Sequence, residues 1–116
     1  MTDRTPTEEL AVQIRATLHA MPEAELPVTY GVLAARLSVP GPGSIRRLTE
    51  ALELTIRQDA AQGRPPVAAL VVARLGGGLP APGFFELAAK LGCLPEDPQA
   101  ARAAYPALFQ RALEAR

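Results

Sequence analysis

The chain has 116 residues, a length that fits one domain with a single hydrophobic core. Its twelve basic and twelve acidic side chains cancel, and 48% of its residues are hydrophobic. No apolar stretch approaches the roughly 20 residues that cross a bilayer, and the acidic first residues lack the layout of a signal peptide, so we expect a cytoplasmic protein without a membrane segment. One Cys and one His exclude a Cys/His zinc site, and we expect no cofactor.

The middle of the chain is more basic than the rest. Between residues 29 and 78, six arginines face three acidic residues, which leaves a net charge of +3 in this segment. This asymmetry indicates an anionic partner, although it is far smaller than the basic patch of a strong non-specific nucleic-acid binder.

Residues 5–8 predict the start of a first helix. Thr5 suits the N-cap, Pro6 suits the first helical position, and Glu8 completes a capping box. Apolar side chains then recur at helical spacing until Pro22, at Leu10, Ile14, Leu18 and Met21. We therefore expect one side of this helix to face the core.

Two further helices are predicted before residue 63. Thr29 is expected to cap a short helix over 30–37, and Ser44 is expected to cap a third helix that runs to about Gln62. Gly63 then supplies a left-handed stop. The apolar stripe of the third helix, which we expect in the core, consists of Ile45, Leu48, Leu52 and Ile56.

The other side of the third helix is predicted to face solvent. Arg46 and Glu50 lie four residues apart, as do Glu53 and Arg57, so each pair can form a surface ion pair. Leu54 lies roughly opposite the apolar stripe. It is therefore either a stray exposed leucine or part of a contact with a partner.

The pattern after residue 63 predicts a β-hairpin and two helices. Residues 67–75 are β-branched and apolar, the glycines at 76–78 suit a turn, and Pro80 and Pro82 make the second strand short. A short helix over 84–91, stopped by Gly92, should anchor the hairpin through two phenylalanines. Asp97 opens a last helix, which Pro106 is expected to kink or divide.

Three helices followed by a hairpin is the element order of a winged helix. We therefore predict one α+β, mainly helical domain over 1–116, with a winged-helix-like three-helix core, a β-hairpin and additional C-terminal helices. Its helical N-terminal part covers 5–62, the hairpin about 66–85, and the C-terminal helices about 84–114.

Two stretches, 28–37 and 44–52, resemble the DNA-binding domain of the alkylguanine-alkyltransferase and alkyltransferase-like family, in which a V-T/P-Y-G helix start precedes an arginine-bearing recognition helix. The resemblance implies that Arg46 takes the place of the arginine that replaces a flipped base, and that Tyr30 belongs to the nucleic-acid-binding surface. The family's methyl-acceptor strand would fall at 64–72, which contains neither Cys nor His. Alkyl transfer and alkyl-lesion recognition are therefore not expected.

A second resemblance involves residues 63–66 and 82–88, which are similar to a segment of small bacterial proteins of uncharacterised function. It implies a related fold and no activity.

Three arginines are the candidate nucleic-acid-binding residues, together with Tyr30. Arg46 and Arg47 lie on the third helix and Arg74 lies beside the triple glycine, and arginine forks fit both phosphate oxygens and guanine edges. The alternatives are an ion-paired helix surface for the first two and a solubilising charge for Arg74. Arg64 either clamps a ligand or pairs with Asp59, and we favour the pairing.

No catalytic constellation is predicted. Cys93 follows a helix stop without a nearby His and is expected to be an inert thiol, whereas His19 is expected to cap the first helix. The sequence therefore favours a non-enzymatic module that binds double-stranded DNA through its third helix and wing. The alternative is a protein-interaction or dimerisation module that uses Leu54 and the Pro-rich segment after the hairpin.

Overall fold

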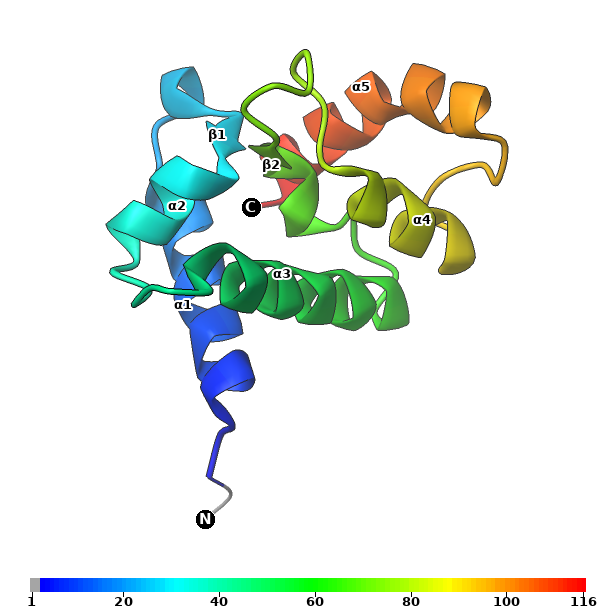
Figure 1. Ribbon diagram of the computed structural model, residues 1–116. Coiled ribbons are helices and arrows are strands. Elements are labelled where there is room, and N and C mark those ends of the chain that lie inside the picture. The colour runs from blue at the N-terminus through cyan, green and yellow to red at the C-terminus, as the bar shows by residue number, and fades with distance from the viewer. Residues whose placement is uncertain (1–2) are drawn as a thin grey trace.

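The computed structural model describes residues 3–116 and shows a mainly helical fold with one small sheet (Figure 1). The mainly helical α+β class is thereby confirmed. None of the helices in the described part of the chain has both the length and the apolar character that crossing a membrane requires. In chain order the elements are α1 (Pro6–Ala20), the 3-10 turn η1 (Glu23–Glu25), β1 (Val28–Thr29), α2 (Tyr30–Arg36), α3 (Ser44–Ala61), the 3-10 turn η2 (Val67–Leu70), β2 (Val71–Val72), α4 (Pro82–Lys90) and α5 (Pro98–Ala115).

The start of α1 is the capping box that the sequence predicts. The backbone N–H of Glu8 donates to Thr5 Oγ1 at 3.1 Å, and the N–H of Thr5 donates to Glu8 Oε1 at the same distance. Ile14 and Leu18 on the inner side of α1 are completely buried. They pack into one core cluster with residues of α2, α3, η2, α4 and α5, so the described residues share a single hydrophobic core.

The two helices after α1 begin close to the predicted residues, but the predicted cap of α3 is wrong. Thr29 caps α2, since its Oγ1 accepts from Val32 N at 3.2 Å. Ser44 is instead the first helical residue of α3, and Gly43 is the N-cap, with a left-handed φ of 82° that favours glycine. Gly63, with φ of 68°, follows the end of α3 as predicted.

The predicted β-hairpin over about 66–85 is wrong. Residues 67–70 form η2, and the two residues of β2 pair with β1 in a parallel arrangement, Val28 with Val71 and Thr29 with Val72. The chain does turn back after β2, because Ala73 N donates to Leu79 O at 2.9 Å. A second strand cannot continue from there, since Pro80 has no N–H to donate and α4 begins at Pro82.

The C-terminal helices pack on each other through aromatic rings. Phe84 on α4 is buried, and its ring meets that of Tyr105 on α5 edge to face, with centroids 6.3 Å apart. The two phenylalanines therefore anchor α4 to α5 instead of anchoring a hairpin. Gly92, with φ of 81°, follows α4 as predicted, and Asp97 caps α5. Helix α5 continues through Pro106, so of the two predicted effects, a kink or a division of the helix, the division is wrong.

Tyr105 also joins α5 to the segment before β2, and this contact can be tested. Its buried hydroxyl donates to Ala69 O at 2.7 Å. Tyr105→Phe leaves that buried carbonyl without the donor, and we expect it to lower the free energy of unfolding by about 1–2 kcal/mol. Urea denaturation followed by circular dichroism measures the change. An unaltered midpoint would show that water replaces the hydroxyl.

Candidate nucleic-acid interface

The first turn of α3 presents two arginines to solvent. The left-handed turn at Gly43 leads directly into the helix, and both Arg46 and Arg47 are exposed. Arg46 Nε lies 3.4 Å from Glu50 Oε1, which confirms this predicted ion pair, and the Arg46 side chain is 85% exposed. Arg47 Nη2 donates to the carbonyl of Pro42 at 3.1 Å, within the turn that precedes the helix.

Neither contact removes a guanidinium group from solvent. An exposed ion pair at i,i+4 contributes only a few tenths of a kcal/mol, so a phosphate can displace Glu50 at little cost. Arg47 keeps N–H donors beyond the one that it gives to Pro42. The second predicted pair, Glu53 with Arg57, is not among the ion pairs of the described residues, which are those with a nitrogen and an oxygen within 4 Å of each other.

Two apolar residues of α3, Ile45 and Leu54, differ from the prediction in their exposure. Leu48, Leu52 and Ile56 are buried as predicted, but Ile45 is 46% exposed, so its assignment to the core is wrong. Leu54 is half-buried and packs against the core, so it is not the freely exposed leucine that the spacing suggests. The exposed apolar side chain of α3 is therefore on its first turn, next to Arg46.

Tyr30, the first residue of α2, is half-buried and acts as a link between elements. Its Oη accepts from Ala81 N at 3.0 Å, which ties the start of α2 to the N-cap residue of α4. Burial raises the pKa of Tyr30, and the hydrogen bond from Ala81 opposes this effect. The hydroxyl therefore stays protonated at neutral pH, and its proton remains available to a further acceptor.

Arg74 is exposed, but the structure does not bring it to the arginines of α3. It lies in the 73–79 loop, which Figure 1 shows at the top of the molecule, whereas α3 runs along the bottom of the body. The loop is tight at Gly76, where a Cβ atom would lie 2.8 Å from Leu79 O. The six central arginines consequently do not gather on one face. Two of them are engaged elsewhere, Arg36 with Glu25 and Arg64 with Asp59.

Cys93 and His19 are the other titratable residues that the sequence singles out. Cys93 is half-buried, and desolvation, together with the charge of Asp59, raises the pKa of its thiol although Arg111 opposes the shift. A thiol with a raised pKa is a poor nucleophile, as the sequence predicts. His19 is exposed in the last turn of α1.

Sequence reasoning missed most of the cluster around Asp59. The predicted pairing of Arg64 with Asp59 is confirmed at 3.2 Å, but Arg15 of α1 approaches the same carboxylate oxygen more closely, at 2.8 Å. Asp59 is 1% exposed. The position of Asp59, three residues after Ile56, could have indicated this cluster, because it lies on the apolar stripe of α3. A carboxylate buried there requires hydrogen-bonding or ionic partners.

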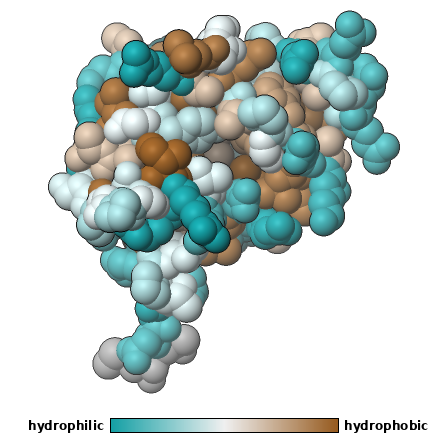
Figure 2. All heavy atoms as spheres, in the orientation of Figure 1, coloured by the Kyte–Doolittle hydropathy of each residue, from teal (hydrophilic) through white to brown (hydrophobic). Residues whose placement is uncertain are grey.

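Figure 2, which has the orientation of Figure 1, shows many hydrophilic side chains and smaller hydrophobic areas on the surface over α3. No protein-family model, no curated protein and no solved structure matches the chain. The residues themselves are therefore the basis for a functional assignment.

Proposed function

We propose that this chain is a non-enzymatic, helix-turn-helix-like module that binds double-stranded DNA through the first turn of α3. The observation that carries the proposal is the exposure of Arg46 and Arg47 on a turn whose opposite side is held in the core by Leu48. Two adjacent guanidinium groups on a rigid helix can contact the phosphates or the base edges of a duplex.

The arrangement of α2 and α3 supports this proposal. Helix α2, a short connection and α3 follow one another as in a helix-turn-helix, whose second helix enters the major groove with its N-terminal residues first. The free N–H groups at the start of α3 add a partial positive charge there. Ile45, exposed beside Arg46, offers an apolar contact of the kind that thymine methyl groups accept.

The sequence resemblance to the alkyltransferase-like DNA-binding domain supports the same surface, with Arg46 at its centre. In this proposal Tyr30 holds α2 against α4. Arg74 has no part in it, because its loop lies away from α3 in Figure 1. The contact is thus a helix without a wing.

The proposal is tested by measuring the fluorescence anisotropy of a labelled duplex of random sequence as the protein is added. The duplex has about 20 base pairs, which is about two turns of DNA, and the titration is repeated at several salt concentrations. We expect the affinity to fall steeply with salt. Arg46→Gln and Arg47→Gln should each reduce the magnitude of the negative slope of log K against log salt by about 1. Arg46→Glu combined with Arg47→Glu should abolish binding.

A matched control removes the same charge elsewhere. Arg102 and Arg111 are exposed on α5, so Arg102→Glu combined with Arg111→Glu changes the net charge equally without touching α3. This variant should keep the slope of the parent chain. Equal loss in both double variants would show attraction by net charge alone, and no binding at low salt would overturn the proposal.

A further inference from the structure

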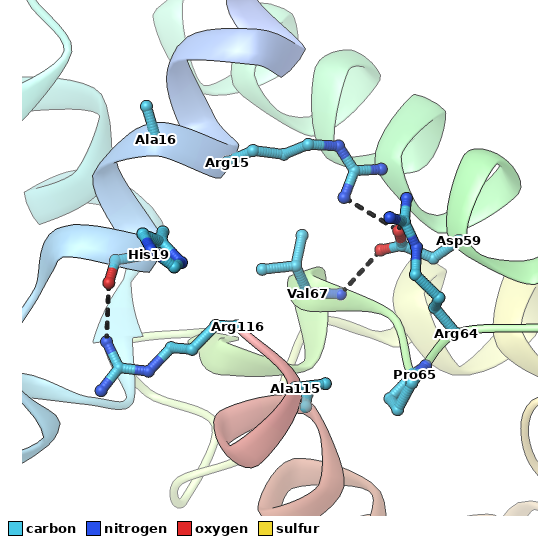
Figure 3. A pocket seen from close by; sticks show the side chains of 10 residues that line it. Arg15, Ala16, His19, Asp59, Arg64, Pro65, Val67, Ala115 and Arg116 are labelled. Atoms are coloured by element: carbon cyan, nitrogen blue, oxygen red, sulfur yellow. Dashed lines mark hydrogen bonds and ion pairs between the residues drawn. The ribbon is translucent and has the colours of Figure 1, made fainter. Parts of the chain in front are cut away.

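A pocket of about 350 Å³ opens between α1, the end of α3, η2 and the end of α5. Figure 3 shows Arg15 and Arg64 reaching the carboxylate of Asp59 from two sides, while Arg116 lies across the pocket near His19. The side chains come from segments that are far apart in the sequence, and Asp59 is the one carboxylate side chain among the described lining residues.

Asp59 holds this arrangement together. Its Oδ1 accepts from Arg15 Nη1 at 2.8 Å and from Arg64 Nη2 at 3.2 Å, and its Oδ2 accepts from Val67 N at 2.9 Å. Arg15 gives further hydrogen bonds to Thr55 O at 3.2 Å and to the side chain of Gln58 at 3.0 Å. Arg15 is therefore fixed in place, with its side chain 29% exposed.

Arg64 is held much less firmly. Within the described residues its guanidinium group makes one side-chain hydrogen bond, to Asp59, and the side chain is 52% exposed. Because a guanidinium group has five N–H donors, Arg64 keeps most of them for a ligand. It lies at the wall of the pocket, where it contacts Asp59, and no other residue in the described part of the chain accepts from its remaining donors.

The charges of the pocket do not balance. Three guanidinium groups, those of Arg15, Arg64 and Arg116, line it with one side-chain carboxylate. Arg116 donates from Nη1 to the carbonyls of Leu18, His19 and Met21 at the end of α1, and its guanidinium group forms no ion pair with a carboxylate side chain of the described residues. Like charges that share a partly desolvated site repel one another, so an added anion lowers the energy of the group.

Apart from His19, the rest of the wall is apolar. It consists of small or aliphatic side chains from four segments, namely Ala16, Pro65, Val67, Ala112 and Ala115. Such a surface favours contact with carbon atoms, whereas the arginines favour oxygen atoms. A ligand that fits both parts has a charged head and an apolar body.

We propose that this pocket binds a small organic anion, with its carboxylate or phosphate head on Arg64 and Arg15 and its apolar body against Val67 and Ala115. The site is separate from the proposed DNA contact. Asp59 lies 13 residues after Arg46 on the same helix, a distance of about 20 Å at 1.5 Å per residue. Ligand binding and DNA binding can therefore be tested independently.

The test uses the full chain, labelled with nitrogen-15, and three probes. Benzoate has both a carboxylate and an apolar ring, inorganic phosphate has the charge alone, and benzyl alcohol has the ring alone. We expect benzoate to give saturable shifts in the amide signals of Val67 and Ala115 and in the Nε–Hε signal of Arg64. Phosphate should bind at least about tenfold more weakly, and benzyl alcohol should give no saturation.

Two variants separate the pocket from the general charge of the surface. Arg64→Gln leaves Asp59 its bonds from Arg15 and Val67, so the fold should persist while benzoate binding weakens about tenfold. Arg46→Gln removes the same charge from a residue outside the pocket and should not change binding.

A third variant tests the apolar part without touching an arginine. Ala115 is exposed at the end of α5, and Ala115→Phe places a ring in the pocket, so benzoate should lose its site. The proposal is overturned if benzoate does not saturate, if phosphate or benzyl alcohol binds as well as benzoate, or if Arg64→Gln and Ala115→Phe bind benzoate as the parent chain does.

Discussion

Replacing Asp59 with alanine is expected to lower the free energy of unfolding by about 3 kcal/mol. The carboxylate is almost completely buried and accepts three hydrogen bonds, from Arg15, Arg64 and the backbone of Val67. Without it, two guanidinium groups remain next to each other, and the Val67 N–H loses its acceptor. The expected loss lies at the lower end of the range for broken buried ion pairs, because Arg64 is half exposed and can be hydrated.

Urea denaturation monitored by circular dichroism measures this loss. Asp97→Ala is the matched control, because Asp97 is an exposed aspartate whose carboxylate accepts one hydrogen bond within the described residues, from Ala100 N at the start of α5. That variant should lose about 1 kcal/mol, the usual contribution of an N-cap. Equal losses in the two variants would mean that the Asp59 cluster contributes no more than a helix cap.

Leu48→Ala is expected to cost about 3 kcal/mol, whereas Ile45→Ala on the same helix should change stability by no more than about 0.5 kcal/mol. Leu48 is completely buried in the core cluster, so its truncation leaves a cavity between α3 and its neighbours. Ile45 is 46% exposed, so its truncation removes much less buried surface than that of Leu48. The two residues lie three positions apart in one apolar stripe of the sequence.

The same denaturation experiment measures both variants, and anisotropy separates their roles. Leu48→Ala should bind the duplex as the parent chain does at temperatures where it remains folded. Ile45→Ala should keep its stability and weaken DNA binding, because Ile45 is exposed on the first turn of α3, the proposed contact surface. A large stability loss in Ile45→Ala would place that side chain in the core, as its spacing suggests.

The helices could be predicted from the sequence because their boundaries depend on neighbouring residues. The capping box at Thr5, the caps at Thr29 and Asp97 and the left-handed glycines after α3 and α4 each involve residues at most a few positions apart. Ser44 was misassigned because Gly43 can occupy the cap position in a left-handed conformation, which its lack of a Cβ permits.

The sheet could not be predicted from local pattern. The β-branched run over 67–75 and the three glycines fit a hairpin, but the partner of Val71 is Val28, and a parallel pair requires a long crossover connection. Pro80 also prevents the return strand from pairing. The predicted partner of this strand is the segment that follows it in the sequence, whereas in the structure β2 pairs with the distant β1.

In the candidate sites too, contacts between residues close in the sequence could be predicted, and contacts between distant residues could not. Arg46 and its pair with Glu50 lie on one helix and were predicted, and so was the pairing of Arg64 with Asp59 across the end of α3. The contact of Arg15 with Asp59 joins residues 44 positions apart, and no local pattern indicates it. The pocket proposed for an organic anion exists only after α1, α3 and α5 have come together.

The 73–79 loop offers a practical site for attaching a reporter. The hydrogen bond between Ala73 and Leu79 holds its two ends together, and Leu75 within it is 92% exposed. A short peptide tag inserted between Gly77 and Gly78 would leave and rejoin the domain at almost one point, where backbone insertions are best tolerated. Since this loop lies away from α3 in Figure 1, a dye carried there can report on a titration without obstructing the helix.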